Sequence, residues 1–341
     1  MKYLFMLIAV FCSGKHLSAQ ILFVDVNSGK PSARGTMEEP LLSIEDAVNR
    51  ANKFQDKKDV VIKLAPGLYT LTRPLLIEGS ALVNNYSIEA LIMPDDTNWL
   101  PVKMPVIQVT ADSNRAGKLQ HASIAIEIER NNVSIKGIKF LGNPNPSSEY
   151  FYAIERKDKA LKNLEISQCY FIGEKNSAAI QGAIFAQGEG IHIDHCIFYN
   201  CKNAVLSFLN VKDFSLTHSI IYGAYEAAFW FGYGEDAGLP FIFRNNIIAN
   251  SNYAIVGYKG TRQNYIFSNS VFADNKYYLG FNGDVIEPDT LNKPTENNIQ
   301  KNGKVILNEI TAEGIPKNYL NPSSISAGKE LKAGIFMKNF N

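Results

Sequence analysis

The sequence predicts an all-β solenoid, a parallel β-helix with three short strands in each coil. The first observation is a pattern of four apolar or small residues at i, i+2, i+5 and i+7, which recurs six times at intervals of 23 to 31 residues. Alternation at i and i+2 is typical of a strand with one buried face, and the extra residue before i+5 indicates a sharp turn into a second strand. A third short apolar run follows each of the last four sets. These segments are rich in Ile, Val, Phe and Tyr, are broken by Asn, Gly and Ser, and show no helical period.

The most regular coils are expected over residues 133–282. The six sets are Val133, Ile135, Ile138, Phe140; Leu164, Ile166, Cys169, Phe171; Ile191, Ile193, Cys196, Phe198; Phe214, Leu216, Ser219, Ile221; Phe241, Phe243, Asn246, Ile248; and Tyr265, Phe267, Ser270, Phe272. The third strands are expected at 204–208, 227–231, 253–256 and 278–281. Leucine-rich repeats have a similar length, but their Leu-x-x-Leu-x-Leu signature is absent.

The residue at i+4 is expected at a corner of every coil. The six residues are Gly137, Gln168, His195, His218, Asn245 and Asn269. Gly and Asn tolerate left-handed backbone, and side-chain amides can bond to the coils above and below. We therefore interpret the two histidines as members of a stacked corner ladder, about 4.8 Å apart, in preference to metal ligands or catalysts. Cys169 and Cys196 share the inward column, which predicts a buried stack and no disulfide.

The two ends of the solenoid need covers, because a solenoid exposes edge strands. A helix is expected at 43–54, with Ser43 as N-cap, Asp46 at the capping-box position and one apolar stripe. Strand-like runs at 60–64, 75–77, 87–91 and 124–128 suggest earlier, less regular coils. Residues 283–341 are expected to hold a polar loop, over 288–302, and a closing coil or tail.

The first twenty residues have the pattern of a secretory signal. Lys2 is followed by a short apolar run and a polar stretch that ends in small residues, so cleavage is expected after Ala19 or Gln20. We therefore expect one exported β-helix domain over 21–341, periplasmic or secreted. The apolar run is too short to span a bilayer, and no later segment is suitable, so no transmembrane segment is expected.

Composition and charge exclude several classes of protein. The chain has 341 residues, 46% of them hydrophobic, which excludes disorder and a collagen-like fibre. Lys and Arg number 34 against 33 Asp and Glu, so no nucleic-acid partner is expected. Three cysteines remain after the signal, and this odd number implies at least one free thiol or an intermolecular bond. They lack zinc-site spacing, and a monomer is expected.

The chain resembles the pectin-lyase-like right-handed parallel β-helix superfamily over nearly all of its length after the signal. The opening is similar to that of many exported bacterial members, including alginate lyases and chondroitinase B, and the end is similar to their closing coil. The motifs are Phe23-Val24-Asp25-Val26-Asn27, Gly35-Thr36, Pro40-Leu41-Leu42-Ser43-Ile44, Ala47-Val48, Ala65-Pro66-Gly67-Leu68-Tyr69, Tyr319-Leu320-Asn321-Pro322, Ser324 and Ala327-Gly328. The resemblance implies a right-handed helix and a polysaccharide-directed protein. These motifs are turns and caps, so they specify fold better than chemistry.

Several catalytic signatures of the superfamily are absent. The chain has no Gly-His-Gly with an aspartate pair, as in polygalacturonases, no Asp-Pro-His of alginate epimerases, and no Arg-x-Gly-Asp-x-His run. An unassigned or inactive branch therefore stays open.

The third strand and the turn after it usually present the binding groove in such solenoids. Four charged segments qualify, namely 155–159, 187–189, 233–236 and 258–262. A uronate lyase needs a cation to neutralise the substrate carboxylate, a base for the C5 proton and an acid for the leaving oxygen. We assign neutralisation to Arg262 or to Ca²⁺ held by Glu189, Glu235 and Asp236. Lys259 or Tyr258 would be the base and Tyr233 the acid.

Aromatic residues near the same face provide a second hint. Trp230 and Phe208 are the candidate substrate-binding residues, with Glu189 beside them, because flat rings suit the apolar faces of sugars. Strand alternation places Phe229 and Phe231 opposite Trp230, although a slip of one residue would bury it. Two interpretations remain: a lyase that cleaves acidic polysaccharide by β-elimination, or a non-catalytic glycan-binding or scaffold protein. A glycoside hydrolase, with two carboxylates as acid and base or nucleophile, is a further alternative.

Overall fold

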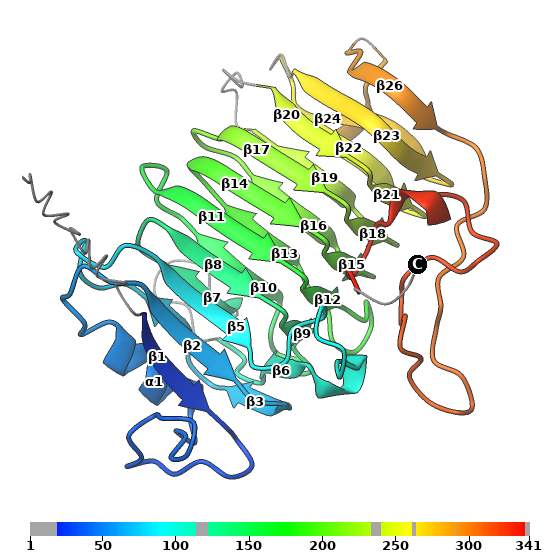
Figure 1. The fold of residues 1–341 in the computed structure, drawn as a ribbon. Coiled ribbons are helices and arrows are strands. Elements are labelled where there is room, and N and C mark those ends of the chain that lie inside the picture. The colour runs from blue at the N-terminus through cyan, green and yellow to red at the C-terminus, as the bar shows by residue number, and fades with distance from the viewer. Residues whose placement is uncertain (1–18, 114–121, 233–239, 261–263, 291, 338–341) are drawn as a thin grey trace, which may run out of the picture.

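The chain winds into a parallel β-helix whose coils stack along one axis (Figure 1). The computed structural model describes residues 19–113, 122–232, 240–260, 264–290 and 292–337. The expected signal at 1–18 lies outside the described residues, and β1 begins at Gln20. Two sheets form the wall of the solenoid, a 17-stranded sheet A and a 9-stranded sheet B.

Sheet A folds around one corner of the solenoid, so that it has two flanks. The first flank consists of β1 (Gln20–Val24), β2 (Val60–Leu64), β5 (Tyr86–Ala90), β8 (Val133–Lys136), β11 (Lys162–Ser167), β14 (Glu189–Asp194), β17 (Lys212–Thr217), β20 (Phe241–Arg244), the start of β23 (Tyr265–Ala273) and β26 (Thr295–Gln300). The second flank consists of β3 (Gly67–Leu71), β6 (Pro105–Val109), β9 (Lys139–Leu141), β12 (Tyr170–Ile172), β15 (Ile197–Tyr199), β18 (Ile220–Tyr222), β21 (Ile247–Ala249) and the end of β23.

Sheet B forms the third side of the solenoid. Its strands are β4 (Leu75–Ile77), β7 (Ala122–Ile128), β10 (Tyr150–Arg156), β13 (Gly182–Ala186), β16 (Asn203–Ser207), β19 (Ala227–Phe231), β22 (Tyr253–Tyr258), β24 (Tyr277–Asn282) and β25 (Ile286–Pro288). All neighbouring pairs of this sheet are parallel except β24 with β25. Three strands per coil, as the repeat predicted, are therefore confirmed.

The interior consists of columns of like residues, because parallel strands in register place equivalent residues one above another. Phe140, Phe171 and Phe198 occupy one column, with ring centroids 5.0 and 4.8 Å apart and planes within 4°. All three rings are fully buried. The i+7 position of the sequence pattern is therefore an inward position, and its aromatic members in these three successive coils stack along the solenoid axis.

The corner between the two flanks of sheet A carries the predicted ladder. All six residues have positive φ, from 44° to 71°, and Asn298 extends the series with a φ of 54°. The rings of His195 and His218 stack with centroids 4.7 Å apart and planes within 9°. The predicted stacking of the two histidines is therefore confirmed, and the spacing is that of adjacent strands.

The inward column beside this corner changes from thiol to hydroxyl and amide along the solenoid. Cys169 and Cys196 are free and buried, as predicted, and Cys201 is too. In later coils the Ser219 hydroxyl accepts from the Cys196 backbone N–H at 3.1 Å, and Asn246 Oδ1 accepts from the Ser219 N–H at 2.9 Å. These polar side chains are therefore buried because each pairs with backbone of the neighbouring coil.

The helix α1 (Ile44–Ala51) covers the first coil and packs against β1, β2 and β4. Ser43 caps it as predicted, since its hydroxyl accepts from the Asp46 backbone N–H at 3.1 Å. The helix ends at Ala51, and the residues up to Phe54 form a turn. Two short 3-10 helices, η1 (Pro101–Lys103) and η2 (Lys329–Leu331), complete the helical elements of the described residues.

The C-terminal part differs from the expected polar loop. Thr295–Gln300 forms β26, which pairs in parallel with β23 and adds another strand to the first flank. Its side chains are mostly exposed and polar, so the apolar alternation that marks the other strands is missing. The following segment, from Val305 to Met337, packs on the outer face of the second flank, where the Tyr170 hydroxyl donates to the Tyr319 carbonyl at 2.8 Å.

None of the helices in the described part of the chain combines the length and the apolar character that crossing a bilayer requires.

Candidate functional site

The outer face of sheet B carries a row of aromatic rings, which we call the ring ladder. It consists of Tyr152, Phe185, Phe208 and Trp230, whose successive ring centroids are 5.4, 5.6 and 5.9 Å apart. These side chains form a cluster separate from the interior core. Because the four residues come from successive coils, the ladder runs along the solenoid axis.

Trp230 lies on this outer face, as strand alternation predicted. Phe229 and Phe231 are buried in the interior core, whereas the Trp230 side chain is partly exposed. Trp230 also contacts a second outer cluster, in which the rings of Tyr253 and Tyr277 stack at 4.7 Å. The buried indole N–H of Trp230 has no hydrogen-bond acceptor among the described residues. The indole ring of Trp230 therefore adds apolar surface to the ladder, whereas its N–H is buried.

A charged cluster lies at the N-terminal end of the ladder. Glu127, Glu155 and Phe185 occupy the same outward column on adjacent strands of sheet B. Lys157 Nζ lies 2.9 Å from Glu127 Oε1 and 3.4 Å from Glu155 Oε2. The Glu155 side chain is fully buried, and this lysine balances its charge. The predicted segment 155–159 therefore does adjoin the aromatic face, although Glu155 itself is not accessible.

Tyr258 and Lys259, the candidate bases, lie at the C-terminal end of β22. Val256 pairs with Trp230 on the neighbouring strand. Tyr258 therefore lies one coil beyond Trp230 and two residues further along its strand. The exposed Lys259 Nζ lies 5.8 Å from the centroid of the Phe281 ring, and no carboxylate of the described residues forms an ion pair with it. A cation without a carboxylate partner in the described part of the chain therefore lies one coil beyond the ladder, on the same sheet.

Glu189 lies at the start of β14, on the first flank of sheet A. Its carboxylate forms an ion pair with Lys162 at 2.9 Å. The hydrogen bond and the charge of Lys162 hold the pKa of Glu189 below its ordinary value, with a further contribution from the charge of Lys212. These cationic surroundings do not fit a Ca²⁺ site. Tyr233, Glu235, Asp236 and Arg262, the other predicted catalytic and metal residues, lie outside the described residues.

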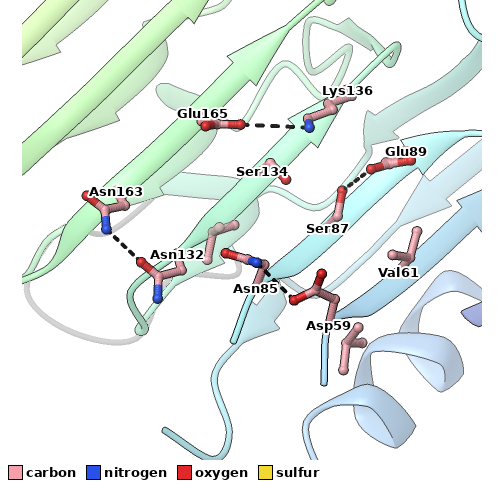
Figure 2. Close-up of a pocket in the computed structure, with 12 residues that line it drawn as sticks. Asp59, Val61, Asn85, Ser87, Glu89, Asn132, Ser134, Lys136, Asn163 and Glu165 are labelled. Atoms are coloured by element: carbon pink, nitrogen blue, oxygen red, sulfur yellow. Dashed lines mark hydrogen bonds and ion pairs between the residues drawn. The ribbon is translucent and has the colours of Figure 1, made fainter. Parts of the chain in front are cut away.

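A polar groove of about 420 Å³ lies on the first flank of sheet A, where β2, β5, β8 and β11 adjoin (Figure 2). Glu89 accepts from Ser87 and from Lys63, both at 2.6 Å. Lys136 lies 3.7 Å from Glu165, and the amide of Asn163 donates to Asn132 at 2.7 Å. These polar groups satisfy one another across strands, which indicates a stabilising role for the groove.

We expect Glu89→Gln to destabilise the fold at neutral pH by about 1 kcal/mol. Burial alone raises the pKa of Glu89, but hydrogen bonds from Lys63 and Ser87 and the charges of Lys63 and Lys136 outweigh it and lower the pKa. In the unfolded state, the pKa of a glutamate side chain is about 4.3. The contribution of Glu89 is therefore present above that pH and is lost as pH falls through the lower folded pKa.

Urea unfolding of wild type and variant at pH 7 and at acid pH measures this effect. The two proteins should differ at pH 7 and converge in acid. Glu165→Gln is the control, since its carboxylate is exposed and should contribute little. A difference between Glu89→Gln and wild type that persists unchanged in acid would contradict the assignment.

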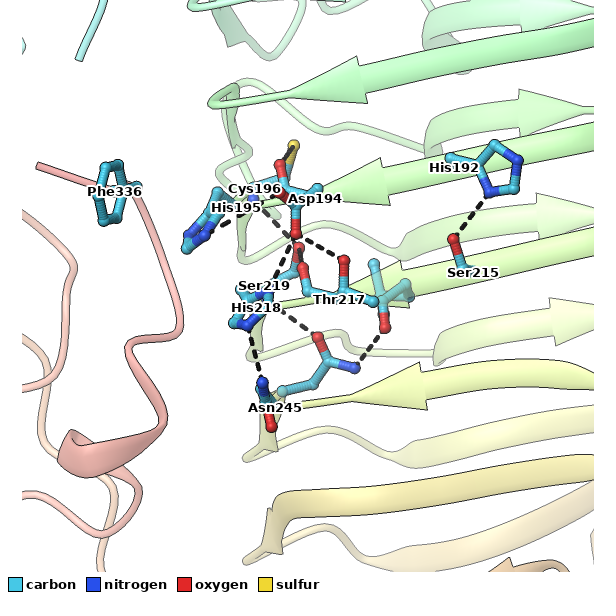
Figure 3. Close-up of polar contacts among 12 residues, drawn as sticks. His192, Asp194, His195, Cys196, Ser215, Thr217, His218, Ser219, Asn245 and Phe336 are labelled. Atoms are coloured by element: carbon cyan, nitrogen blue, oxygen red, sulfur yellow. Dashed lines mark hydrogen bonds and ion pairs between the residues drawn. The ribbon is translucent and has the colours of Figure 1, made fainter. Parts of the chain in front are cut away.

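The corner histidines belong to a further polar cluster (Figure 3). Asp194 Oδ1 accepts from the Thr217 hydroxyl at 2.5 Å and from His218 Nδ1 at 3.0 Å. His195 Nδ1 donates to the Gly334 carbonyl at 2.9 Å. Burial lowers the pKa of His195, so its imidazole is neutral at neutral pH. A cavity of about 460 Å³ adjoins the cluster, and Leu331, Lys332 and Phe336 of the C-terminal segment line its other side.

Sequence reasoning missed the partners of several of these groups. The pairing of Lys157 with Glu127 crosses 30 residues and an irregular early coil, where the repeat gives no register. The role of Asp194 was also missed, although its position in the repeat gives an indication. Asp194 immediately precedes the corner position of its coil, and Thr217 holds the same position in the next coil.

The fold was compared with known proteins. A comparison with curated proteins gave no match. Among solved structures, a rhamnogalacturonan lyase matches with a TM-score of 0.45 and 14% identity, over 76% of this chain and 70% of the other. A pectin methylesterase from Aspergillus niger matches with a TM-score of 0.43 and 16% identity, over 88% of this chain and 93% of the other. A PL6 alginate lyase in complex with a trisaccharide matches with a TM-score of 0.41 and 11% identity, over 86% of this chain and 62% of the other.

The family model provides the stronger result. The description of the matching family is "right handed beta helix region", and its model matches residues 124–307, more than half of the chain. This range includes all the regular coils expected from the repeat up to 282. The handedness that the sequence resemblance implied is confirmed as well. The chain belongs to the right-handed β-helix family.

Proposed function

We propose that this protein binds a polysaccharide chain along the outer face of sheet B. The ring ladder is the observation that carries the proposal. Four rings from four successive coils form an extended and partly apolar strip, in which one ring contact is tilted and two are edge-to-face. Apolar ring surface along such a strip suits the C–H faces of consecutive sugars.

The charges around the ladder favour an acidic polysaccharide. Lys157 at one end is balanced by Glu127 and Glu155. Lys259 at the other end has no carboxylate partner among the described residues, so its charge is available to a ligand. The negative charge of a uronate carboxylate would balance the positive charge of Lys259. The described binding strip therefore has an excess of uncompensated positive charge near its C-terminal end.

Cleavage by β-elimination is the second function that we propose, and the position of Tyr258 and Lys259 beside the ladder favours it. A base removes the C5 proton, the electron pair forms the C4=C5 double bond, and the C4–O bond breaks as the leaving oxygen takes up a proton. Lys259 or Tyr258 would be the base. We assign neutralisation of the substrate carboxylate to Arg262 and the acid role to Tyr233, both outside the described residues.

Binding is tested with Trp230→Ala and Phe208→Ala. We expect each variant to bind acidic polysaccharide about tenfold to one hundredfold more weakly, because one stacked ring contributes about 1–3 kcal/mol in comparable stacking sites. The measurement is isothermal titration with oligosaccharides of alginate, pectate, chondroitin sulfate and ulvan.

Tyr222→Ala is the matched control for binding. Tyr222 is also a partly buried ring in a stacked pair, with Tyr199 at 5.8 Å, but it lies on the second flank of sheet A. Its binding should equal that of wild type. If Trp230→Ala and Phe208→Ala bind as tightly as Tyr222→Ala and wild type, the ladder is rejected as the binding surface.

Cleavage is tested by mixing the protein with the same four polymers and following the ultraviolet absorbance of the unsaturated uronate product. A rise with one polymer would support β-elimination. New reducing ends without that absorbance would instead indicate hydrolysis. Neither signal, with binding retained, would leave the protein as a glycan-binding β-helix and reject cleavage.

A further inference from the structure

The corner cluster of sheet A contains two electron-pair donors that face each other. His195 Nδ1 donates its hydrogen to the Gly334 carbonyl, so Nε2 of the neutral ring carries a lone pair. This Nε2 lies 4.0 Å from Asp194 Oδ2. Oδ2 accepts no hydrogen bond from the described residues, because Thr217 and His218 both donate to Oδ1. A cation between the two atoms would satisfy both.

The separation suits a metal ion. Bonds from Zn²⁺ to imidazole nitrogen and to carboxylate oxygen are each about 2.0–2.2 Å. In a tetrahedral site such bonds place two ligand atoms about 3.3–3.6 Å apart. The 4.0 Å between Asp194 Oδ2 and His195 Nε2 therefore has to shorten by less than about 1 Å when the ion binds. One ligand atom from each of Asp194, His195 and His218 lies within 4.8 Å of the other two. A third ligand is thus within reach of the same ion.

We propose that Asp194, His195 and His218 bind a divalent transition-metal ion of the Zn²⁺ type at this corner. The ligand atoms would be Asp194 Oδ2, His195 Nε2 and His218 Nδ1. His218 now donates from Nδ1 to Asp194, so the metal-bound form needs the hydrogen on Nε2 and the Asn245 amide turned so that its oxygen accepts it. The His218 ring also has to rotate, since the two imidazoles now stack within 9° of parallel. Two imidazoles and one carboxylate favour Zn²⁺, Co²⁺ or Ni²⁺ over Ca²⁺ and Mg²⁺, which prefer oxygen ligands.

Neighbouring groups already hold His195 and Asp194 in place, and a polar side chain also contacts His218. The Gly334 carbonyl accepts from the far nitrogen of His195, which is the usual outer contact of a metal-binding histidine. The Thr217 hydroxyl donates to Asp194, and the Asn245 amide lies 2.7 Å from His218 Nε2. A corner ladder alone accounts for the stacked rings and for Asn245. It does not account for His195 Nε2, which faces Asp194 Oδ2 and receives no hydrogen bond from the described residues.

The adjoining cavity leaves room for water as a fourth ligand. His195 and His218 line one side of it, and the C-terminal segment lines the other (Figure 3). Phe336, whose ring centroid lies 5.4 Å from that of His195, and Leu331 make this side apolar, whereas Glu330 and Lys332 add one charge of each sign. The ring ladder lies on the other sheet of the solenoid, so this site is separate from the proposed polysaccharide-binding face.

Titration of the full-length protein with Co²⁺ alone tests the proposal, since Co²⁺ replaces Zn²⁺ and its visible absorption reports its ligands. We expect one Co²⁺ per chain, displaced by Zn²⁺, and a thermal unfolding midpoint that rises with Zn²⁺ concentration. Asp194→Asn, His195→Asn and His218→Asn should each weaken binding at least tenfold. Asparagine is suited to these corners, because Asn245 and Asn269 have the same left-handed backbone.

The control is His192→Asn. His192 is also on β14 and bonds to Ser215 at 2.8 Å, but it is not part of the cluster. Its removal should leave Co²⁺ binding unchanged. No saturable binding by wild type, or binding that all three cluster variants retain, would overturn the proposal. Loss of binding in His192→Asn as well would also overturn it, because binding would then not depend on the corner.

Discussion

We expect Phe171→Ala to lower the free energy of unfolding by about 3–5 kcal/mol. Phe171 is fully buried, and its ring is stacked between those of Phe140 and Phe198 at 5.0 and 4.8 Å. Removing it takes a ring from the middle of a column. The coils on either side are held apart by backbone hydrogen bonds of the flanks, so the column cannot close over the cavity.

Equilibrium unfolding in urea, followed by circular dichroism, measures this loss. Phe171→Leu is the matched variant, because it keeps most of the apolar volume and should cost less than about 1.5 kcal/mol. Tyr222→Ala, which removes a partly exposed ring from a stacked pair, should also cost less than Phe171→Ala. A loss below about 1 kcal/mol in Phe171→Ala would mean that the column relaxes, contrary to the close packing expected of a solenoid core.

The regular coils could be predicted because each coil repeats the same physical problem. An inward residue at i, i+2, i+5 and i+7 and a left-handed residue at i+4 recur wherever the chain turns the same corner. Gln168 shows how strong this constraint is, since Gln is not a usual left-handed residue and yet its φ is 57°. The period predicted the corner position of Gln168, and the structure adds its left-handed conformation.

The irregular parts could not be predicted in the same way. The strand Thr295–Gln300 has no apolar alternation, because it is the last strand of its flank and its outer and edge surfaces face solvent. Gly67–Leu71 pairs with Pro105–Val109, and the long connection between them hides the period. The repeat therefore identifies a strand only where the strand itself keeps the apolar pattern.

For the candidate site, the sequence predicted the outward direction of Trp230 but not the contacts of the charged residues. Alternation placed Trp230 outward correctly, since its two neighbours are large apolar residues with a core to fill. The pairing of Glu189 with Lys162 was not predicted, because an ion pair between coils depends on the exact register of two turns. The roles of Trp230 and Glu189 toward a ligand remain predictions.

Lys259→Ala should abolish most cleavage of an acidic polysaccharide, with a loss in kcat of about 10²–10⁴-fold, if the proposed β-elimination holds. Lys259 is exposed at the end of β22, beside Tyr258 and one coil beyond Trp230. Initial rates of the rise in ultraviolet absorbance measure the effect. Lys276→Ala is the matched control, because its Nζ also lies over a ring, 5.1 Å from the centroid of Tyr277. Lys276 immediately precedes β24, the strand next to β22, and so lies at the opposite end of the strands from Lys259. Its rate should equal that of wild type.

Lys259→Arg distinguishes the two chemical roles open to this lysine. An arginine keeps the positive charge but is a poor base, since it stays protonated at all relevant pH values. If Lys259 removes the C5 proton, arginine should restore binding but not the rate. If Lys259 instead neutralises the substrate carboxylate, arginine should restore most of the rate, and Tyr258→Phe should then show the large loss expected of the base. Full activity in Lys259→Ala and in Tyr258→Phe would reject both assignments, while the binding assay with Trp230→Ala would still test the ring ladder independently.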